Sequence, residues 1–158
     1  MSKRTFFQSI LSAKSNPGTP QKFFAMVEPN PDWIQNMPHQ FLGEAEVSGT
    51  IEFENDTALL RATVRVPMRF VCDRCATSFD KNLLAETEAE FCEIGEYEEP
   101  SEIEMEYKIL SNRINLEPVV RDIVLEQIPS QVLCKVDCKG LCPVCGENLN
   151  FSSCRCKK

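Results

Sequence analysis

A strict alternation of polar and apolar side chains runs through much of residues 44–70, and it constrains the fold more than any other feature of the chain. In residues 44–54 the even positions are polar and the odd positions are apolar or small. Successive side chains of a β-strand point to opposite faces, so this pattern predicts a strand with one buried face. Residues 58–70 alternate again, with an apolar face made by Ala62, Val64, Val66, Met68 and Phe70.

Asn55 and Asp56 separate the two alternating runs and are typical turn residues. If they form a two-residue hairpin loop, the register of the two strands follows. The apolar faces then coincide without a slip, which supports an antiparallel pair. The predicted partners include Phe53–Ala58, Ile51–Leu60, Val47–Val64 and Glu46–Arg65.

Four further segments complete the predicted elements. Alternation in residues 83–91 predicts a third strand, residues 105–109 predict a fourth, and residues 22–27 are a candidate for another. The apolar residues between Asn115 and Pro129 have helical spacing, with Asn115 as the N-cap and Pro129 ending the helix.

These elements predict an α+β fold, namely a mainly antiparallel β-sheet with one principal helix and a C-terminal Cys-rich zinc-binding module. We expect an irregular, proline-rich N-terminal segment over residues 1–41, where five prolines restrict regular structure to short pieces. The sheet and helix core is expected over 42–132, and the Cys-rich module over 133–158.

Six of the nine cysteines fall within the last 25 residues, and two Cys-x2-Cys pairs are present. Such pairs place two thiolates on one metal ion from a single short turn. The neighbouring residues are Lys, Asp, Gly and Pro, so the cysteines do not read as core residues. We therefore predict one or two structural Zn²⁺ ions, with ligands drawn from Cys72, Cys75, Cys134, Cys138, Cys142, Cys145, Cys154 and Cys156.

The spacing leaves the partition of these thiols open. Cys142, Cys145, Cys154 and Cys156 could close a local site, or Cys138 could replace one of the last two. Cys72 and Cys75 could join Cys134 and Cys138 in a second site that ties the tail to the sheet. A thioredoxin-like redox role for Cys72 and Cys75 is the alternative, but such a pair should open a helix, and strands flank this one.

The sequence shows no catalytic constellation, which argues against an enzyme. His39 is the single histidine, and neither a glycine-rich phosphate loop nor a Ser/His/Asp grouping is present. The net charge of −7 disfavours a general nucleic-acid coat. No apolar stretch is long enough to span a membrane, and no signal peptide is evident, so we expect a cytoplasmic protein.

Three stretches carry a resemblance to a known family: VCDRCATSF after an apolar strand, the helix INLEPVVRDIVLEQIP, and CKVDCKGLCPVCGENLNFSSCRC. In this order, over roughly residues 42–158, they resemble the YceD family of large ribosomal RNA subunit accumulation proteins. The resemblance implies a non-enzymatic factor in ribosome biogenesis that supports accumulation or processing of 23S rRNA. The implied partner is large-subunit rRNA or a pre-ribosomal particle, with no membrane and no small-molecule substrate.

Basic residues in two regions are candidates for RNA contact. An arginine stripe lies on the polar face of the second strand, although acidic residues across the ladder could equally pair with it. The Cys-rich end carries a basic excess. The candidates are Arg61, Arg65, Arg69, Arg74, Lys135, Lys139, Arg155 and Lys157.

An acidic run supports a second functional hypothesis. Residues 86–106 contain ten glutamates and no lysine or arginine, a composition typical of a solvated edge. The alternative function is a zinc-bearing adaptor that docks a basic ribosomal protein through this acidic face.

Overall fold

The structure is a computed structural model that describes residues 6–151 and residue 156. It contains three α-helices in the described residues: α1 (Leu11–Ser15), α2 (Glu102–Met105) and α3 (Glu117–Gln127). Within this part of the chain, none of the helices is long and apolar enough to cross a membrane.

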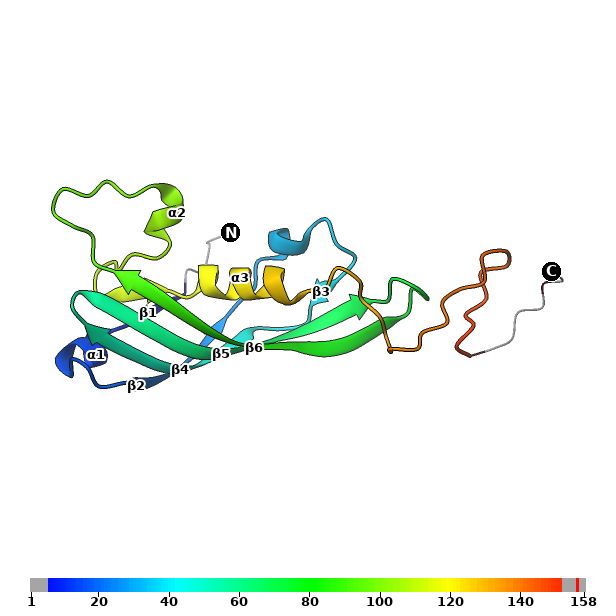
Figure 1. Ribbon diagram of the computed structural model, residues 1–158, viewed down its shortest axis with the longest axis horizontal. Coiled ribbons are helices and arrows are strands. Elements are labelled where there is room, and N and C mark those ends of the chain that lie inside the picture. Colours follow the sequence, from blue (N-terminus) through cyan, green and yellow to red (C-terminus); the bar gives the residue numbers. More distant parts are fainter. Residues whose placement is uncertain (1–5, 152–155, 157–158) are drawn as a thin grey trace.

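A five-stranded antiparallel sheet is the main structure, with one long strand inside it and a second, equally long strand at its edge (Figure 1). β5 (Thr57–Val71) and β6 (Ser78–Cys92) have 15 residues each and pair along their whole length. At 3.3–3.4 Å per residue each is about 50 Å long. On its other edge β5 pairs with β4 (Ala45–Glu54) and, further along, with β3 (Gln40–Phe41), while β2 (Gln21–Val27) pairs with β4. The predicted mainly antiparallel sheet is confirmed.

The hairpin between β4 and β5 has the predicted register. Asn55 and Asp56 form its loop with φ of 51° and 61°. A two-residue hairpin loop of the favoured hand requires this left-handed conformation at both positions, and Asn and Asp tolerate it. The observed partners include all four predicted pairs: Phe53–Ala58, Ile51–Leu60, Val47–Val64 and Glu46–Arg65.

Gly49 lies in β4 opposite Ala62, at a place where the two strands approach closely. A Cβ atom on residue 49 would lie 1.9 Å from the carbonyl oxygen of Arg61 and 2.8 Å from Cα of Ala62. Both of these are backbone atoms, so no side chain can move aside to make room. Glycine is therefore required at this point of the sheet.

The N-terminal segment is more regular than we predicted. The predicted strand at 22–27 is present as β2, and β1 (Phe7–Ser9) pairs with β7 (Arg113–Asn115) in a separate two-stranded sheet. Between β2 and β3 lies the 3-10 helix η1 (Pro31–Ile34). The prolines restrict the segment less than expected because they fall between the elements or open η1, where a missing N–H costs little. The predicted domain boundaries stay a prediction.

The core lies between one face of the sheet and α3 (Figure 1). Every second residue of β5 from Ala58 to Phe70 is buried, which matches the predicted apolar face. From α3 the buried side chains include Val119, Val120, Ile123 and Val124. The predicted helix is confirmed, although it begins at Glu117, where the backbone N–H donates to Oδ1 of Asn115 at 3.0 Å. Asn115 therefore caps the first turn from two residues before the helix.

The predicted strand over 105–109 is wrong. Residues 102–105 form α2. Within 105–109 the described β-type pairing is an isolated bridge between Lys108 and Cys92. Ser101 and Glu104 make a capping box, in which Ser101 N–H donates to the Glu104 carboxylate at 2.8 Å and Glu104 N–H to Ser101 Oγ at 3.4 Å. This Ser-x-x-Glu signal starts a helix, and it outweighs the short alternation that we read as a strand.

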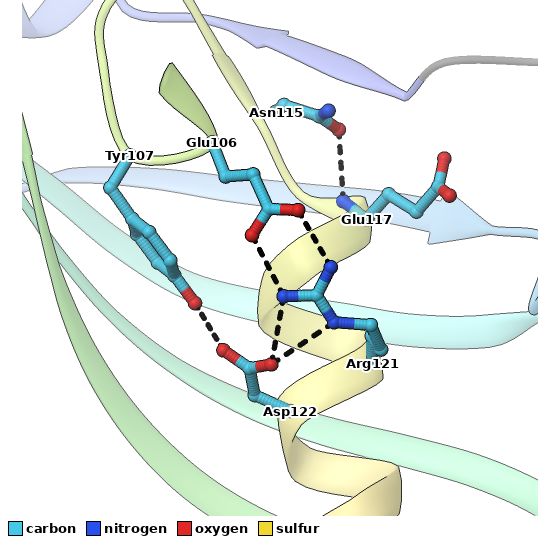
Figure 2. Close-up of polar contacts among 6 residues, drawn as sticks. All are labelled: Glu106, Tyr107, Asn115, Glu117, Arg121 and Asp122. Atoms are coloured by element: carbon cyan, nitrogen blue, oxygen red, sulfur yellow. Dashed lines mark hydrogen bonds and ion pairs between the residues drawn. The ribbon is translucent and has the colours of Figure 1, made fainter. Parts of the chain in front are cut away.

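Side-chain contacts join α3 to the segment that follows α2 (Figure 2). The Arg121 guanidinium donates to both carboxylate oxygens of Glu106, at 2.7 and 2.8 Å, and also to Asp122. The Tyr107 hydroxyl donates to the other oxygen of Asp122. The bond from Arg121 holds the pKa of Glu106 below its ordinary value, so this carboxylate is charged in the folded protein.

Candidate metal centre

The turn between β5 and β6 carries the first pair of candidate ligands. β5 ends at Val71, and the turn closes with Cys72 N–H donating to Thr77 C=O at 2.9 Å and Ala76 N–H to Cys72 C=O at 3.0 Å. Ala76 has a φ of 58°, so the chain turns sharply after Cys75. Both thiols of the pair are buried, at 2% and 4% exposure.

The chain after α3 returns to this turn and brings a second pair of thiols to it. Asp73 N–H donates to Val132 C=O at 2.7 Å, and Val132 N–H donates to the Asp73 carboxylate at 2.6 Å. These two bonds hold Val132 against the turn, two residues before Cys134. Arg74 Nη1 also donates to Cys138 C=O at 3.1 Å. Two turns that are about 60 residues apart in the chain are thereby held against each other.

Four sulfur atoms meet where the turns touch. The Sγ atoms of Cys72 and Cys138 are 3.6 Å apart, as are those of Cys75 and Cys134. All four Sγ atoms lie within 4.8 Å of one another. Sulfurs at the vertices of a tetrahedron with metal–sulfur bonds of about 2.3 Å are about 3.8 Å apart. The cluster therefore has the donor type, number and spacing to hold one metal ion.

The protein environment favours thiolate at two of these positions. Burial raises the pKa of Cys72, but bonds from the backbone N–H groups of Cys75, Cys134 and Arg74 outweigh it and lower the pKa to about 6. The hydrogen bond with the Thr77 hydroxyl lowers the pKa of Cys75. Burial raises the pKa of Cys134 to about 12, and the neighbouring thiols add to the effect. A divalent cation would replace the proton on such a group.

A second group of thiols lies in the following loop. Cys142, Cys145 and Cys156 have Sγ atoms within 4.8 Å of one another, and the Cys142–Cys156 separation is 3.9 Å. Gly146 follows with a φ of 76°, and its N–H donates to Cys142 C=O at 2.9 Å. The predicted fourth ligand, Cys154, lies outside the described residues. These three thiols could hold a metal ion.

Two asparagines that follow Cys145 in the chain bond to the first group of thiols, and sequence reasoning gave them no role. Asn150 Nδ2 donates to Cys138 Sγ at 3.3 Å and to Asn148 Oδ1 at 2.9 Å. Asn148 Nδ2 donates to the Thr77 hydroxyl at 3.2 Å, which itself bonds Cys75. Such bonds orient metal ligands and adjust their charge. The sequence signal that could have indicated this role is Asn148-Leu-Asn150, which closely follows the pair Cys142 and Cys145.

Gly140 allows the two turns to come this close. It has a φ of 76°, and a Cβ atom there would lie 3.2 Å from the carbonyl oxygen of Arg74. A larger residue would be strained and would also push the second turn away from the first. Cys92, by contrast, lies in neither group, with its sulfur 4.0 Å from the Thr57 hydroxyl.

The three arginines of the predicted stripe share the outer face of the sheet, and each has a partner. Arg61 Nε donates to Glu88 at 3.0 Å, Arg69 makes a bidentate pair with Asp80 at 2.8 and 3.2 Å, and Arg65 lies 3.9 Å from Glu46. The bond to Asp80 raises the pKa of Arg69 and lowers that of Asp80. Exposed pairs of this kind are weak, but they place a carboxylate where a phosphate would bind.

The other candidate RNA contacts lie at the Cys-rich end. Lys135 and Lys139 are exposed, and so is Arg74 beside them in space. Arg155 and Lys157 lie outside the described residues. The structure thus separates the candidates into a paired group on the sheet and a group around the thiol clusters.

Comparison with known proteins gives two matches. The model of the family described as "Large ribosomal RNA subunit accumulation protein YceD" matches residues 60–158, which include both thiol groups. A maize protein (Zea mays) named "Large ribosomal RNA subunit accumulation protein YCED homolog 1, chloroplastic" is 37% identical over 54 residues, which is 34% of this chain and 18% of the maize protein. The match thus spans less than a fifth of that relative. No solved structure matches significantly.

Proposed function

This chain belongs to the YceD family of large ribosomal RNA subunit accumulation proteins, and we propose that it supports accumulation of 23S rRNA in the cytoplasm by binding the RNA or a pre-ribosomal particle. The family is named for an accumulation factor rather than for an enzyme. The observation that carries the proposal is the family match over residues 60–158, since it covers most of β5, all of β6 and α3, and the thiol groups together.

We further propose that the thiols hold structural zinc. Cys72, Cys75, Cys134 and Cys138 would hold one ion, and Cys142, Cys145 and Cys156 with Cys154 a second. Four cysteine ligands leave no position for water, so the ion would stabilise the fold and would not activate a substrate. The Cys-rich end is short and would gain much of its stability from the metal.

The RNA contact is proposed at the Cys-rich end, through Arg74, Lys135 and Lys139 with Arg155 and Lys157. Arg74, Lys135 and Lys139 are exposed and lie in the two turns that carry the first thiol cluster, which suits contact with phosphate. The sheet arginines are less suited, because their carboxylate partners would have to be displaced first. A second role for the basic residues is electrostatic: four thiolates and one Zn²⁺ carry a formal charge of −2, which nearby cations offset.

The test is UV crosslinking of the tagged protein in its own cells, with sequencing of the attached RNA. We expect reads concentrated on one region of large-subunit rRNA. Lys135→Glu with Lys139→Glu should reduce them severalfold, whereas the matched pair Lys22→Glu with Arg113→Glu, which changes two exposed cations elsewhere, should not.

Metal content of each variant separates the two roles of the lysines. Loss of crosslinking with full zinc content supports direct phosphate contact. Equal crosslinking in both double variants would refute the assignment to the Cys-rich end, and background reads in the unmodified protein would refute direct RNA contact.

A further inference from the structure

β6 has one edge that is open for most of its length. Among the described residues it pairs with β5 over all 15 positions, without a bulge, and the free edge is used at Cys92 alone. There the Cys92 N–H donates to Tyr107 C=O at 3.1 Å and the Cys92 C=O accepts from Ile109 N–H at 2.8 Å. The backbone groups of Cys92 therefore point away from β5.

The direction of the other backbone groups follows from this. In a regular antiparallel ladder, alternate residues direct both N–H and C=O to the same side. Glu90, Glu88 and Glu86 thus also point both groups away from β5, and no hydrogen bond joins these groups to another described residue. A row of unpaired donors and acceptors of this kind is a template for an added strand.

The side chains along this edge are acidic on both sides. Glu86, Glu88 and Glu90 lie on the outer face. A cavity of about 220 Å³ lies at the edge between β6 and α3, and its lining includes Glu88, Glu90, Asp122 and Glu126 but no lysine or arginine. Arg61 pairs with Glu88, and Asp122 bonds Arg121 and Tyr107 (Figure 2), which leaves Glu90 and Glu126 without a basic partner among the described residues.

We propose that the open edge of β6 binds an extended, lysine- and arginine-rich segment of another protein as an added strand. Main-chain bonds to Glu86, Glu88 and Glu90 would supply affinity, and a basic side chain in the cavity would supply specificity. A second copy of β6 is a poor occupant, because its glutamates would face these glutamates across the new ladder. Nucleic acid is disfavoured by the same charge.

This surface is separate from the proposed RNA contact. Glu90 lies 12 residues along β6 from Ser78, where the strand leaves the Cys-rich turn, a distance of about 40 Å. The protein could therefore hold a basic protein segment at one end and RNA at the other, and the two proposals can fail independently.

Binding of a defined peptide to the full-length protein tests the proposal. The probe is a fluorescein-labelled decapeptide of alternating lysine and valine, and its control is a decapeptide of alternating glutamate and valine. We expect the lysine peptide alone to bind. Glu90→Lys with Glu126→Lys should raise its Kd about tenfold or more, because two of the four carboxylates at the cavity are reversed. Glu96→Lys with Glu99→Lys makes the same change of net charge in an exposed loop and should raise the Kd much less.

A second pair of variants tests main-chain pairing. Glu86→Pro removes an outward N–H without removing a bond to β5, whereas Glu86→Ala loses the same charge and keeps the N–H. We expect a larger rise in Kd for proline than for alanine, and slower amide exchange at Glu86, Glu88 and Glu90 when the peptide is bound.

Four results would overturn the proposal: no binding of the lysine peptide, equal losses in both charge variants, binding without protection of these amides, or pairing of two β6 edges detected as a dimer by sedimentation. RNA crosslinking should be unchanged in the β6 variants. Failure of the crosslinking test with the Lys135 and Lys139 variants would count against the RNA proposal and would leave the β6 proposal unaffected.

Discussion

Asp73 joins the two turns of the first thiol cluster, and its removal should weaken metal binding by about tenfold. Its carboxylate accepts the N–H of Val132 at 2.6 Å, two residues before Cys134, and Val132 is 4% exposed. A hydrogen bond to a charged group contributes about 1.5–3 kcal/mol. Since Asp73 itself is exposed, we take the lower end, and about 1.4 kcal/mol corresponds to a factor of ten.

The assay is competition for Zn²⁺ between the protein and a chromophoric chelator. Asp73→Ala should lose about tenfold in affinity, and Asp73→Asn should lose less, because its amide oxygen still accepts the bond without a charge. Asp137→Ala is the matched control, since Asp137 is an exposed aspartate of the same region that makes no such bond to another described residue. If Asp73→Ala and Asp137→Ala have the same affinity, the reasoning that the Asp73–Val132 bond positions Cys134 is refuted.

Three further predictions concern the sheet, its pH dependence and the metal. Gly49→Ala should lower the free energy of unfolding in urea by about 2–4 kcal/mol because of its backbone clash, whereas Gly95→Ala, whose Cβ would lie 3.5 Å from the Glu98 side chain, should change it little. The pKa of Glu106 is lowered in the folded state from the ordinary 4.5, so its stabilising contribution is complete above about pH 4.5 and is lost as the pH falls below that value. In that acid range the free energy of unfolding of Glu106→Gln should therefore depend less on pH than that of the unmodified protein. Chelation should speed amide exchange in residues 132–151 while the far-UV circular dichroism of the sheet persists, because the buried thiols form a cluster apart from the main core, and Cys92→Ser should not alter this response.

The hairpin was predictable because two independent signals agreed. Alternation set which side chains of β4 and β5 face the core, and Asn55-Asp56 set the loop length, so the register had no freedom left. The partners of the arginines were harder to predict. β6 begins at Ser78, five residues before the strand that we predicted. The prediction missed residues 78–82 because they are largely polar and alternate weakly. The pair Arg69–Asp80 depends on that extension.

The grouping of the thiols could not be predicted from spacing. It depends on where α3 ends and on how the chain from residue 129 to 134 returns to the β5–β6 turn, which are tertiary features. The bonds between Asp73 and Val132 hold the returning chain against the turn, and Val132 lies in no motif that would predict them. The strand wrongly predicted at 105–109 shows the converse, since there a local signal was present in Ser101 and Glu104 and we did not read it.

The separation of the first cluster in the chain has a consequence during protein synthesis. Cys75 and Cys134 are 59 positions apart, and β6 and α3 lie between them. A ribosome that makes this chain therefore releases Cys72 and Cys75 long before their partners exist. Until Cys134 and Cys138 have been synthesised, Cys72 and Cys75 lack their partner thiols at the end of the β5–β6 hairpin. During this time the two thiols are open to oxidation or to transient binding of a metal ion. The cluster can close only after Cys138 has been synthesised, so a closed cluster shows that β6 and α3 have already been made.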